Sequence, residues 1–373
     1  MMSTGLDGVV AATTRLSHVD GERGELVIAG FNVEELAEHA TFEETTWLLW
    51  HGDLPSAQQL SEFRERLGAN AALSPSIVDV LRTCAHRRLD VMDALGAALL
   101  TLKLEGDDGP GIVGRVPTIV ATYWRLLCRH EPLAPRPDLG YAGSFLFMLH
   151  GCEPYPDEVS GLETYLNTVV DHGLNASTFT ARVITSTGSD LKSAVVGAIG
   201  ALKGPLHGGA PGPALDMVLE IGEASRAEAF LRTKLESGEK LMGFGHRVYK
   251  VRDPRADVLA KAAERLFMRV GDMSLYTLAR SVEADALRLL ETYKPGRRLQ
   301  TNVEFYTALL LHGLGLHAAL FTPVFVMSRV SGWIAHAIEQ RQANRLIRPQ
   351  SEYVGPRGMT WVPLAERNGS HSG

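Results

Sequence analysis

Four short segments of the 373-residue chain gather side chains that can do chemistry. They read Asp171-His172-Gly-Leu-Asn175-Ala-Ser177, Lys203-Gly-Pro-Leu-His207-Gly-Gly, Gly243-Phe-Gly245-His246-Arg247-Val-Tyr249-Lys250 and Thr301-Asn302-Val-Glu304-Phe-Tyr306. Each places a titratable group where a helix is expected to begin or end, often beside glycine. Glycine lets a ligand approach the backbone closely, and helix termini favour anions.

Together these segments offer two kinds of chemistry. The three histidines can donate hydrogen bonds to a developing oxyanion. A cluster of cations suits a carboxylate or a phosphate, and it comprises Arg247, Lys250, Arg252 and Arg255. Each histidine taken singly is more typical of an ordinary surface or satisfied core position, and the functional interpretation rests on the three together.

Glu304 lies between Val303 and Phe305 in an otherwise apolar stretch. A carboxylate in such surroundings is placed to act as a desolvated base. It is also consistent with an acidic residue in the first turn of a helix, where it meets the helix dipole. The residues alone leave both interpretations open.

Several other sites are excluded or disfavoured. None of the three histidines lies three or four residues from another His or Cys, so no metal site is predicted, although distant segments could still assemble one. The three cysteines contain no C-x-x-C pair, which disfavours a disulfide framework and fits a reducing compartment. Gly109-Pro-Gly111-Ile-Val-Gly114 matches a dinucleotide-binding pattern, but no strand precedes it, and a loop is expected there. The chain has neither a G-x-S-x-G elbow nor a P-loop.

Composition indicates a globular, mostly α protein. Hydrophobic residues make up 45% and charged residues 21%, and the net charge of −6 argues against a nucleic-acid partner. Helix starts are predicted at the capping box Thr41–Glu44, at Ser74-Pro75 and at Asp90, and the apolar run 194–202 predicts a buried helix. Residues 15–19 and 25–29 flank a turn and predict one N-terminal β-hairpin.

The domain organisation is predicted from a change in composition. The Gly/Pro-rich segment 204–213 precedes a more charged stretch that ends near Arg298. We expect residues 209–308 to form a small domain, inserted into a large helical domain made of residues 1–208 and 309–373. Residues 307–327 carry no Asp, Glu, Lys or Arg, but glycines and a proline interrupt them, so a buried hairpin is predicted rather than a membrane span.

The four segments, in this order and at these separations, resemble the citrate synthase family, in its short bacterial form of citrate synthase or 2-methylcitrate synthase. The resemblance runs from Gly5 to Gly355, and its most specific parts are G-P-L-H-G-G and G-F-G-H-R-V-Y-K. It implies a nearly all-α, two-domain homodimer whose small domain closes over the cleft. It also implies an acyltransferase of the tricarboxylic acid cycle, which condenses acetyl-CoA and oxaloacetate without a cofactor.

The resemblance also implies roles for single residues. His207 would hold the thioester carbonyl, Glu304 would remove the methyl proton, and His246 would polarise the ketone of oxaloacetate. Oxaloacetate and citrate would be bound by His172, Arg255, Arg329 and, from the partner subunit, the residue equivalent to Arg348. The CoA phosphates would meet Arg247 and Lys250.

One departure from the family pattern concerns the base, which is usually Asp and here is Glu304. The extra methylene can displace the carboxylate by about an ångström. A non-catalytic relative that binds CoA or a carboxylate therefore stays as one alternative to citrate synthase. A 2-methylcitrate synthase that uses propionyl-CoA is another, because the two acyl groups differ by one methyl group. No targeting segment is evident, so a cytoplasmic location and no membrane partner are expected.

Overall fold

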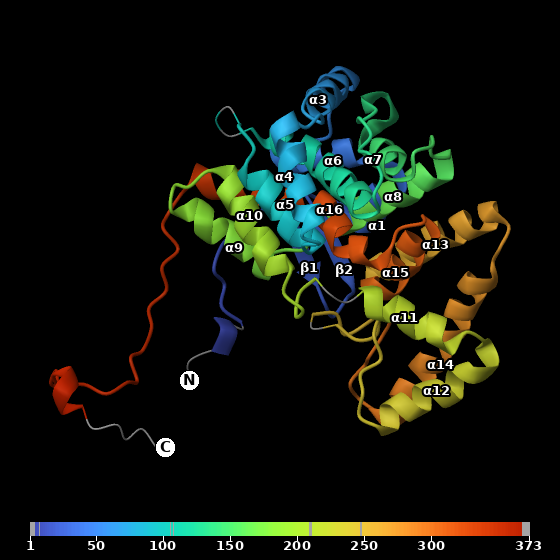
Figure 1. Cartoon of the computed structure of the whole chain (residues 1–373). Coiled ribbons are helices and arrows are strands. Elements are labelled where there is room, and N and C mark those ends of the chain that lie inside the picture. The colour runs from blue at the N-terminus through green and yellow to red at the C-terminus, as the bar shows by residue number, and fades with distance from the viewer. Residues whose placement is uncertain are drawn as a thin grey trace.

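The computed structural model describes residues 4–6, 8–104, 106, 108–208, 211–246 and 248–367. Within these ranges the chain forms sixteen α-helices and one small antiparallel sheet, which confirms the mostly α prediction (Figure 1). The helices of the first half are α1 (Val33–His39), α2 (Phe42–His51), α3 (Ala57–Ala69), α4 (Pro75–His86), α5 (Val91–Leu100), α6 (Gly109–Leu127), α7 (Gly140–His150) and α8 (Pro156–Val169). Those of the second half are α9 (Ala176–Ser186), α10 (Leu191–Leu202), α11 (Pro211–Ile221), α12 (Ala224–Glu236), α13 (Pro254–Val270), α14 (Ser274–Tyr293), α15 (Val303–Gly313) and α16 (Phe321–Gln342).

The sheet contains the predicted hairpin, β1 (Ser17–Asp20) and β2 (Glu25–Ile28), and a short β3 (Phe31–Asn32) that the sequence did not reveal. Ser17 pairs with Ile28 and Asp20 pairs with Glu25. Asp20 shapes the turn, because its Oδ1 accepts from the backbone N–H groups of Glu22 and Arg23 at 3.0 and 2.9 Å. A hairpin of this size is marginal alone. Leu26 and Ile28 are buried against the helices.

The predicted helix starts are confirmed. Thr41 and Glu44 form a reciprocal capping box at α2, which ends at Gly52 in the left-handed conformation. Ser74 precedes Pro75 at the start of α4, and Asp90 accepts a hydrogen bond from the Met92 N–H at the start of α5. The Thr41 and Asp90 side chains fix where α2 and α5 begin because they satisfy backbone groups that the helix itself leaves unbonded. Ser74 makes no such bond, and α4 begins instead with Pro75, whose missing N–H costs nothing in the first turn.

Helix α16 runs through the centre of the larger helix group and packs against α2, α5, α6, α8, α9 and α10 (Figure 1). The range Ala318–Gln342 is long and apolar enough to span a membrane by composition, but 78% of its apolar window is buried inside the fold. Trp333 on this helix is fully buried. The segment therefore behaves as a core helix, which agrees with the buried hairpin predicted for residues 307–327.

A second helix group consists of α11, α12 and α14 (Figure 1). Helices α13 and α15 pack against each other and contact both groups. The strand-like segment around Phe244 forms an isolated bridge with Thr301, so the segments that carry His246 and Glu304 lie side by side. Backbone hydrogen bonds between residues 243–245 and 300–302 reinforce this pairing.

Two sequence expectations need correction. Residues Gly109–Gly114 are not a loop but the first turns of α6, where Asp108 caps the helix and Pro110 occupies its first turn. The run 194–202 does form a helix, α10, but only one side of it is fully buried. Val196 and Gly197 are half-buried and Gly200 is exposed.

After α16 the chain leaves the helical body as an extended tail (Figure 1). The tail exposes large apolar side chains, among them Val354 at 88% and Trp361 at 81%. Arg348 lies in this tail and is exposed.

Candidate active site

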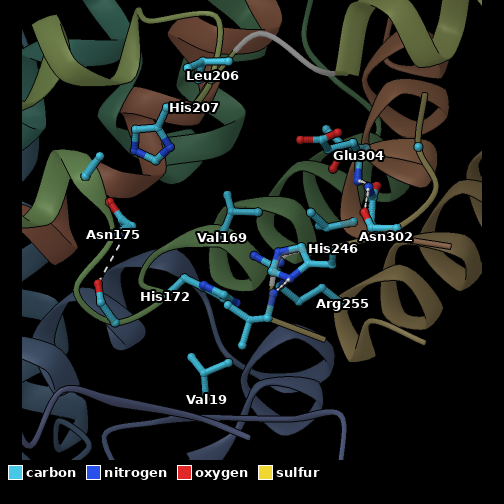
Figure 2. A pocket seen from close by; sticks show the side chains of 18 of the residues that line it. Val19, Val169, His172, Asn175, Leu206, His207, His246, Arg255, Asn302 and Glu304 are labelled. Atoms are coloured by element: carbon cyan, nitrogen blue, oxygen red, sulfur yellow. Dashed lines mark hydrogen bonds between the residues drawn. The ribbon is translucent and has the colours of Figure 1, made fainter. Parts of the chain in front are cut away.

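One cavity of about 1250 Å³ is lined by residues from all four sequence segments. His172, His207, His246 and Glu304 all line it, as do Arg255 and Arg329 (Figure 2). In the view of Figure 2, His172, His246 and Arg255 form one group, while His207 and Glu304 stand apart from each other. Two other predicted site residues, Lys250 and Arg348, do not line the cavity. Arg247 lies outside the described residues.

The proton of His207 is located by a main-chain contact. The Ser177 N–H, on the first turn of α9, donates to His207 Nε2 at 3.3 Å, and Ser177 Oγ lies 2.9 Å from the same nitrogen. A backbone N–H can only donate, so Nε2 accepts and Nδ1 carries the proton. Burial is the main reason that the pKa of His207 falls to about 4, and the nearby Arg329 adds to it. The ring is therefore a neutral hydrogen-bond donor at neutral pH.

His246 is fixed in the opposite tautomer by the same kind of contact. The backbone N–H groups of Val248 and Tyr249 donate to its Nδ1 at 3.0 and 3.1 Å. Nε2 therefore carries the proton. Burial lowers the pKa of His246 to about 4, and the positive charge of Arg255 acts in the same direction. The site thus holds a second neutral imidazole with one N–H to donate.

His172 follows the end of α8 and packs beside His246, with 5.7 Å between the ring centroids. Its Nε2 lies 3.1 Å from the Tyr249 hydroxyl. Burial, together with Arg255 and Arg329, holds the pKa of His172 well below its usual value. Three uncharged imidazoles and two guanidinium groups therefore share the cavity.

Arg255 is held rigidly at the start of α13. Its Nε and Nη2 donate to Asp253 Oδ1 and Oδ2 at 3.0 and 2.8 Å, and both side chains are buried. Asp253 also accepts from the Arg255 N–H, as the cap of α13, and from the Val303 N–H at 3.2 Å. One carboxylate thus joins the beginnings of α13 and α15 and orients the guanidinium.

Arg329 on α16 is buried, and the charge of Asp171 acts on it without an ion-pair contact. Its Nε donates to the Val169 carbonyl at 2.7 Å and its guanidinium lies 4.6 Å from the Phe325 ring centroid, but it forms no ion pair with the carboxylates that the structure describes. Burial is the largest cause that lowers its pKa, to about 10, and the charge of Arg255 contributes. A buried cation in this state favours an anionic ligand.

Glu304 stands in the first turn of α15, where Asn302 caps the helix by accepting from the Glu304 N–H at 3.0 Å. Asn302 Nδ2 in turn donates to the Gly245 carbonyl at 2.8 Å, which links the base position to the His246 segment. Burial raises the pKa of Glu304 to about 7, although Arg255 opposes the shift. A carboxylate with such a pKa is suited to proton transfer near neutral pH.

No group of three or more His, Cys, Asp or Glu is arranged to hold a metal ion in the part of the chain that the structure describes. The chemistry that the described side chains can supply is proton transfer by Glu304 and hydrogen bonding by neutral imidazoles. Two guanidinium groups add anion binding.

Comparison with known proteins decides the family. The family model described as the C-terminal domain of citrate synthase matches residues 5–350. Citrate synthase 2 of Bacillus subtilis is 41% identical over 375 residues, which cover 97% of this chain and 98% of that protein. The chain belongs to the citrate synthase family. Enzymes of this family are acyltransferases that condense acetyl-CoA with oxaloacetate.

Other citrate synthase relatives and structures agree. The 2-methylcitrate synthase of Mycobacterium tuberculosis is 39% identical over 364 residues, covering 94% of this chain and 90% of that protein. The crystal structure of citrate synthase from Pyrobaculum aerophilum matches with a TM-score of 0.89 at 37% identity, over 98% of this chain and 95% of that one. A ternary complex of carboxymethyl coenzyme A and oxaloacetate with citrate synthase from Thermoplasma acidophilum matches with a TM-score of 0.89 at 31% identity, over 98% and 100% of the two chains.

Beneath this citrate synthase site lies a buried polar network that the sequence did not reveal. Asp171 Oδ1 lies 3.1 Å from His336 Nε2, and both side chains are fully buried. His336 Nδ1 accepts from Arg182 Nε at 3.0 Å, so Nε2 carries the proton that is donated to Asp171. The other Asp171 oxygen accepts from Ser17 Oγ at 2.5 Å. The partners lie more than 150 residues apart along the chain, so no local pattern could identify them.

Sequence reasoning also overlooked Lys240, which lines the cavity, and two neighbouring cations that line it as well, Lys294 and Arg297. Lys294 and Arg297 belong to the run Lys-Pro-Gly-Arg-Arg at 294–298. A Pro-Gly turn flanked by cations is a visible signal for an anion-binding loop, and it could have been used.

Proposed function

We propose that the chain is an active citrate synthase that converts acetyl-CoA, oxaloacetate and water to citrate and CoA. The observation that carries the proposal is one cavity with a carboxylate of raised pKa, two neutral imidazoles of fixed tautomer and a buried guanidinium that forms no ion pair with the described carboxylates. A binding protein would need the guanidinium groups but not the carboxylate and the imidazoles together.

Oxaloacetate is a small dianion, and Arg255 and Arg329 are the groups that we propose to bind its carboxylates. Asp253 holds the guanidinium of Arg255 in one orientation. A substrate carboxylate would give Arg329 the ion pair that it does not form with the described carboxylates. His172 adds a hydrogen bond beside them. Bidentate arginine contacts fix the ligand's orientation as well as its affinity.

The first chemical step is removal of a methyl proton from acetyl-CoA. Glu304 accepts this proton, while His207 Nδ1–H donates to the thioester oxygen on which negative charge develops. The C–H electron pair becomes the enol double bond. Neutral donors preorganised in this way contribute a few kcal/mol of transition-state stabilisation, since they need no reorganisation during the reaction.

The second step forms the carbon–carbon bond. The enol carbon attacks the ketone carbon of oxaloacetate, and the electron pair of the C=O bond moves to the ketone oxygen. This oxygen takes the proton of His246 Nε2 and becomes a hydroxyl, and the proton that Glu304 removed from the methyl group restores the imidazole. Water then cleaves the citryl thioester and releases CoA. His207 and Glu304 stand apart in Figure 2, so we propose that a small domain, residues 209–308, closes on the large domain to bring them together.

Positive charge in the lining of the cavity supports binding of the CoA phosphates. Lys294 and Arg297 line the cavity, and we propose them for this role beside the Arg247 and Lys250 inferred from the family pattern. The thioester is a substrate, so no separate cofactor is proposed.

We propose a homodimer in which Arg348 completes the partner's site. Two observations support this: the tail that carries Arg348 exposes large apolar side chains, and α10 leaves one apolar side half-buried. The cytoplasm is the proposed location. Free thiols at Cys84, Cys128 and Cys152 suit a reducing compartment.

A second candidate activity differs from the first only in the acyl group of the thioester substrate. The 2-methylcitrate synthase of M. tuberculosis is nearly as similar as the B. subtilis citrate synthase, at 39% against 41% identity. The two reactions differ by one methyl group, for which a pocket discriminates by only about 1–3 kcal/mol. We propose acetyl-CoA as the main substrate and propionyl-CoA as the alternative.

The deciding experiment measures thiol release from acetyl-CoA and from propionyl-CoA, each with and without oxaloacetate. Oxaloacetate-dependent release is expected, and the ratio of kcat/KM values names the preferred acyl group. Glu304→Gln should abolish release while oxaloacetate still binds in calorimetry. If folded protein binds oxaloacetate but releases no thiol from either thioester, the non-catalytic relative is favoured.

A further inference from the structure

The turn of the N-terminal hairpin contacts the loop that carries His246. The Lys250 N–H donates to the Gly21 carbonyl at 2.8 Å. A Cβ added at Gly21 would lie 2.2 Å from the Val248 carbonyl oxygen and 2.7 Å from its carbon. The two backbones therefore meet at a distance that no side chain at position 21 would permit.

A second glycine repeats this close approach. Gly24 has a φ of +70°, and a Cβ there would lie 2.7 Å from Val251 Cγ2 and 3.2 Å from the Arg252 carbonyl oxygen. The hairpin turn thus packs closely against the loop formed by residues 248–252.

The peptide groups held by the turn are the ones that hold the imidazole. Val248 presents its carbonyl to Gly21, and its own N–H donates to His246 Nδ1. Tyr249, the next residue, supplies the second N–H. A shift of this loop would therefore move both N–H donors away from Nδ1. The ring of His246 could then carry its proton on either nitrogen.

The other end of strand β1 contacts the segment that carries His172. Ser17 Oγ donates to Asp171 Oδ2 at 2.5 Å and accepts from the Gly173 N–H at 2.8 Å. The residues on both sides of His172 are thus tied to Ser17, while the turn after Asp20 holds the His246 loop. One four-residue strand, Ser17–Asp20, spans the two histidine segments.

We propose that Gly21 is a positioning residue, through which the N-terminal hairpin sets the place and tautomer of His246 relative to His172. The proposal rests on the proposed function only in giving His246 the ketone of oxaloacetate. A misplacement of about 1 Å at a reacting group can cost about a hundredfold in rate. The alternative is that the hairpin only stabilises the fold.

The first test is Gly21→Ala, with Glu22→Ala as the matched control. Position 22 lies in the same turn, and its exposed carboxylate pairs with Arg298 at 3.9 Å, the one ion pair it makes with the described residues, so it contributes little. We expect Gly21→Ala to lower kcat at least about tenfold with a smaller change in KM for acetyl-CoA, and Glu22→Ala to match the parent. Equal kcat values for Gly21→Ala and the parent would overturn the proposal.

A readout independent of catalysis separates this inference from the proposed function. With ¹⁵N-labelled histidine, the ring nitrogens of the parent should report a proton on His246 Nε2. In Gly21→Ala we expect a population with the proton on Nδ1. Such a shift in an inactive parent would support the positioning role while the proposed function fails. An unchanged ring spectrum with full catalysis would overturn the positioning role alone.

A gentler pair of variants covers the case in which Gly21→Ala does not fold. Asp20→Ala removes the acceptor for the Glu22 and Arg23 N–H groups, whereas Asp20→Asn keeps an oxygen in place. We expect a fall in kcat and a shift in the His246 ring spectrum for Asp20→Ala, with recovery in Asp20→Asn. Parental behaviour of Asp20→Ala in both measurements would contradict the proposal.

Discussion

Two imidazoles in the cavity owe the position of their protons to main-chain N–H groups. Ser177 supplies the donor to His207, and Val248 and Tyr249 supply the donors to His246. A backbone donor cannot be turned into an acceptor by rotation, unlike a hydroxyl. The two rings therefore carry their protons on opposite nitrogens, Nδ1 in His207 and Nε2 in His246.

The acid side of the pH–rate profile should report Glu304. Its pKa of about 7 means that the carboxyl group must lose a proton before it can act as a base. We expect kcat/KM for acetyl-CoA to fall about tenfold for each pH unit below 7, since kcat/KM reflects ionisations of the free enzyme. Glu304→Asp should move this limb to lower pH, because aspartate has the lower ordinary pKa. A limb unchanged in that variant would assign it to another group.

The same group makes stability depend on pH. Its pKa in the folded protein lies above the ordinary 4.5, so between these values the folded state binds more protons than the unfolded one. Stability is therefore lost as pH rises through 7. Glu304→Gln should exceed the parent in free energy of unfolding by up to about 3 kcal/mol above pH 7, and match it below pH 4.5. Denaturant unfolding at both pH values checks this, and a gap independent of pH would contradict it.

Much of the site could be predicted residue by residue from the sequence. The motifs around His172, His207, His246 and Glu304 predict four residues that the fold brings to one cavity. The tautomers could not be predicted, because they depend on contacts such as that between Ser177 and His207, 30 residues apart. The full burial of Arg329 without an ion-pair partner was equally hidden, since it depends on the packing of α16.

Among the elements, the beginnings of α13 and α15 form one unit around Asp253. This carboxylate caps α13, accepts from the Val303 N–H in α15, and holds Arg255 in a bidentate pair. The Asp-Pro-Arg sequence indicates the cap from its spacing alone. The contact with α15 could not be anticipated, because 50 residues separate Asp253 from Val303.

Asp253→Asn should therefore weaken both the fold and the binding of oxaloacetate. The variant leaves the buried Arg255 without its counter-charge, for which we expect a loss of about 2–4 kcal/mol in denaturant unfolding. KM for oxaloacetate should rise more than KM for acetyl-CoA. Asp272→Asn is the control, because Asp272 accepts from the Ser274 N–H at an exposed helix start and should cost less than about 1 kcal/mol. Equal effects of the two variants would argue against the bridging role of Asp253.

For the whole molecule, the decisive question is whether Arg348 serves the partner's cavity. Arg348→Ala and Glu304→Gln should each be inactive as pure dimers. Subunits of the two variants, mixed and allowed to exchange, should regain about a quarter of the parental activity, because half of the dimers are hybrids with one complete site. Sedimentation should show dimers throughout. Absence of any recovery in exchanged samples would place Arg348 outside the partner's site.

The large-scale architecture was predictable where composition and periodicity were strong. The mostly α class, the hairpin and the buried segment 307–327 are confirmed. The first turns of α6 were mistaken for a loop because Gly109, Pro110 and Gly111 have low helix propensity, which packing in the core overrides. The side of α10 that is not fully buried could not be identified from the sequence, because residues 194–202 are uniformly apolar.

The polar network under the cavity has a consequence for how the protein is made. Ser17, Asp171 and His336 meet at one point, and the Arg15 N–H donates to Glu339 Oε1 across 324 residues of chain. During synthesis the hairpin leaves the ribosome long before α16 exists, so Asp171, the neighbour of His172, lacks its His336 partner until the last α-helix is added. Contacts of such sequence separation form slowly because a large loop must close first. A chain that stops short of α16 should therefore keep many of its helices but lack both the His336 contact to Asp171 and the Arg329 side chain of the cavity.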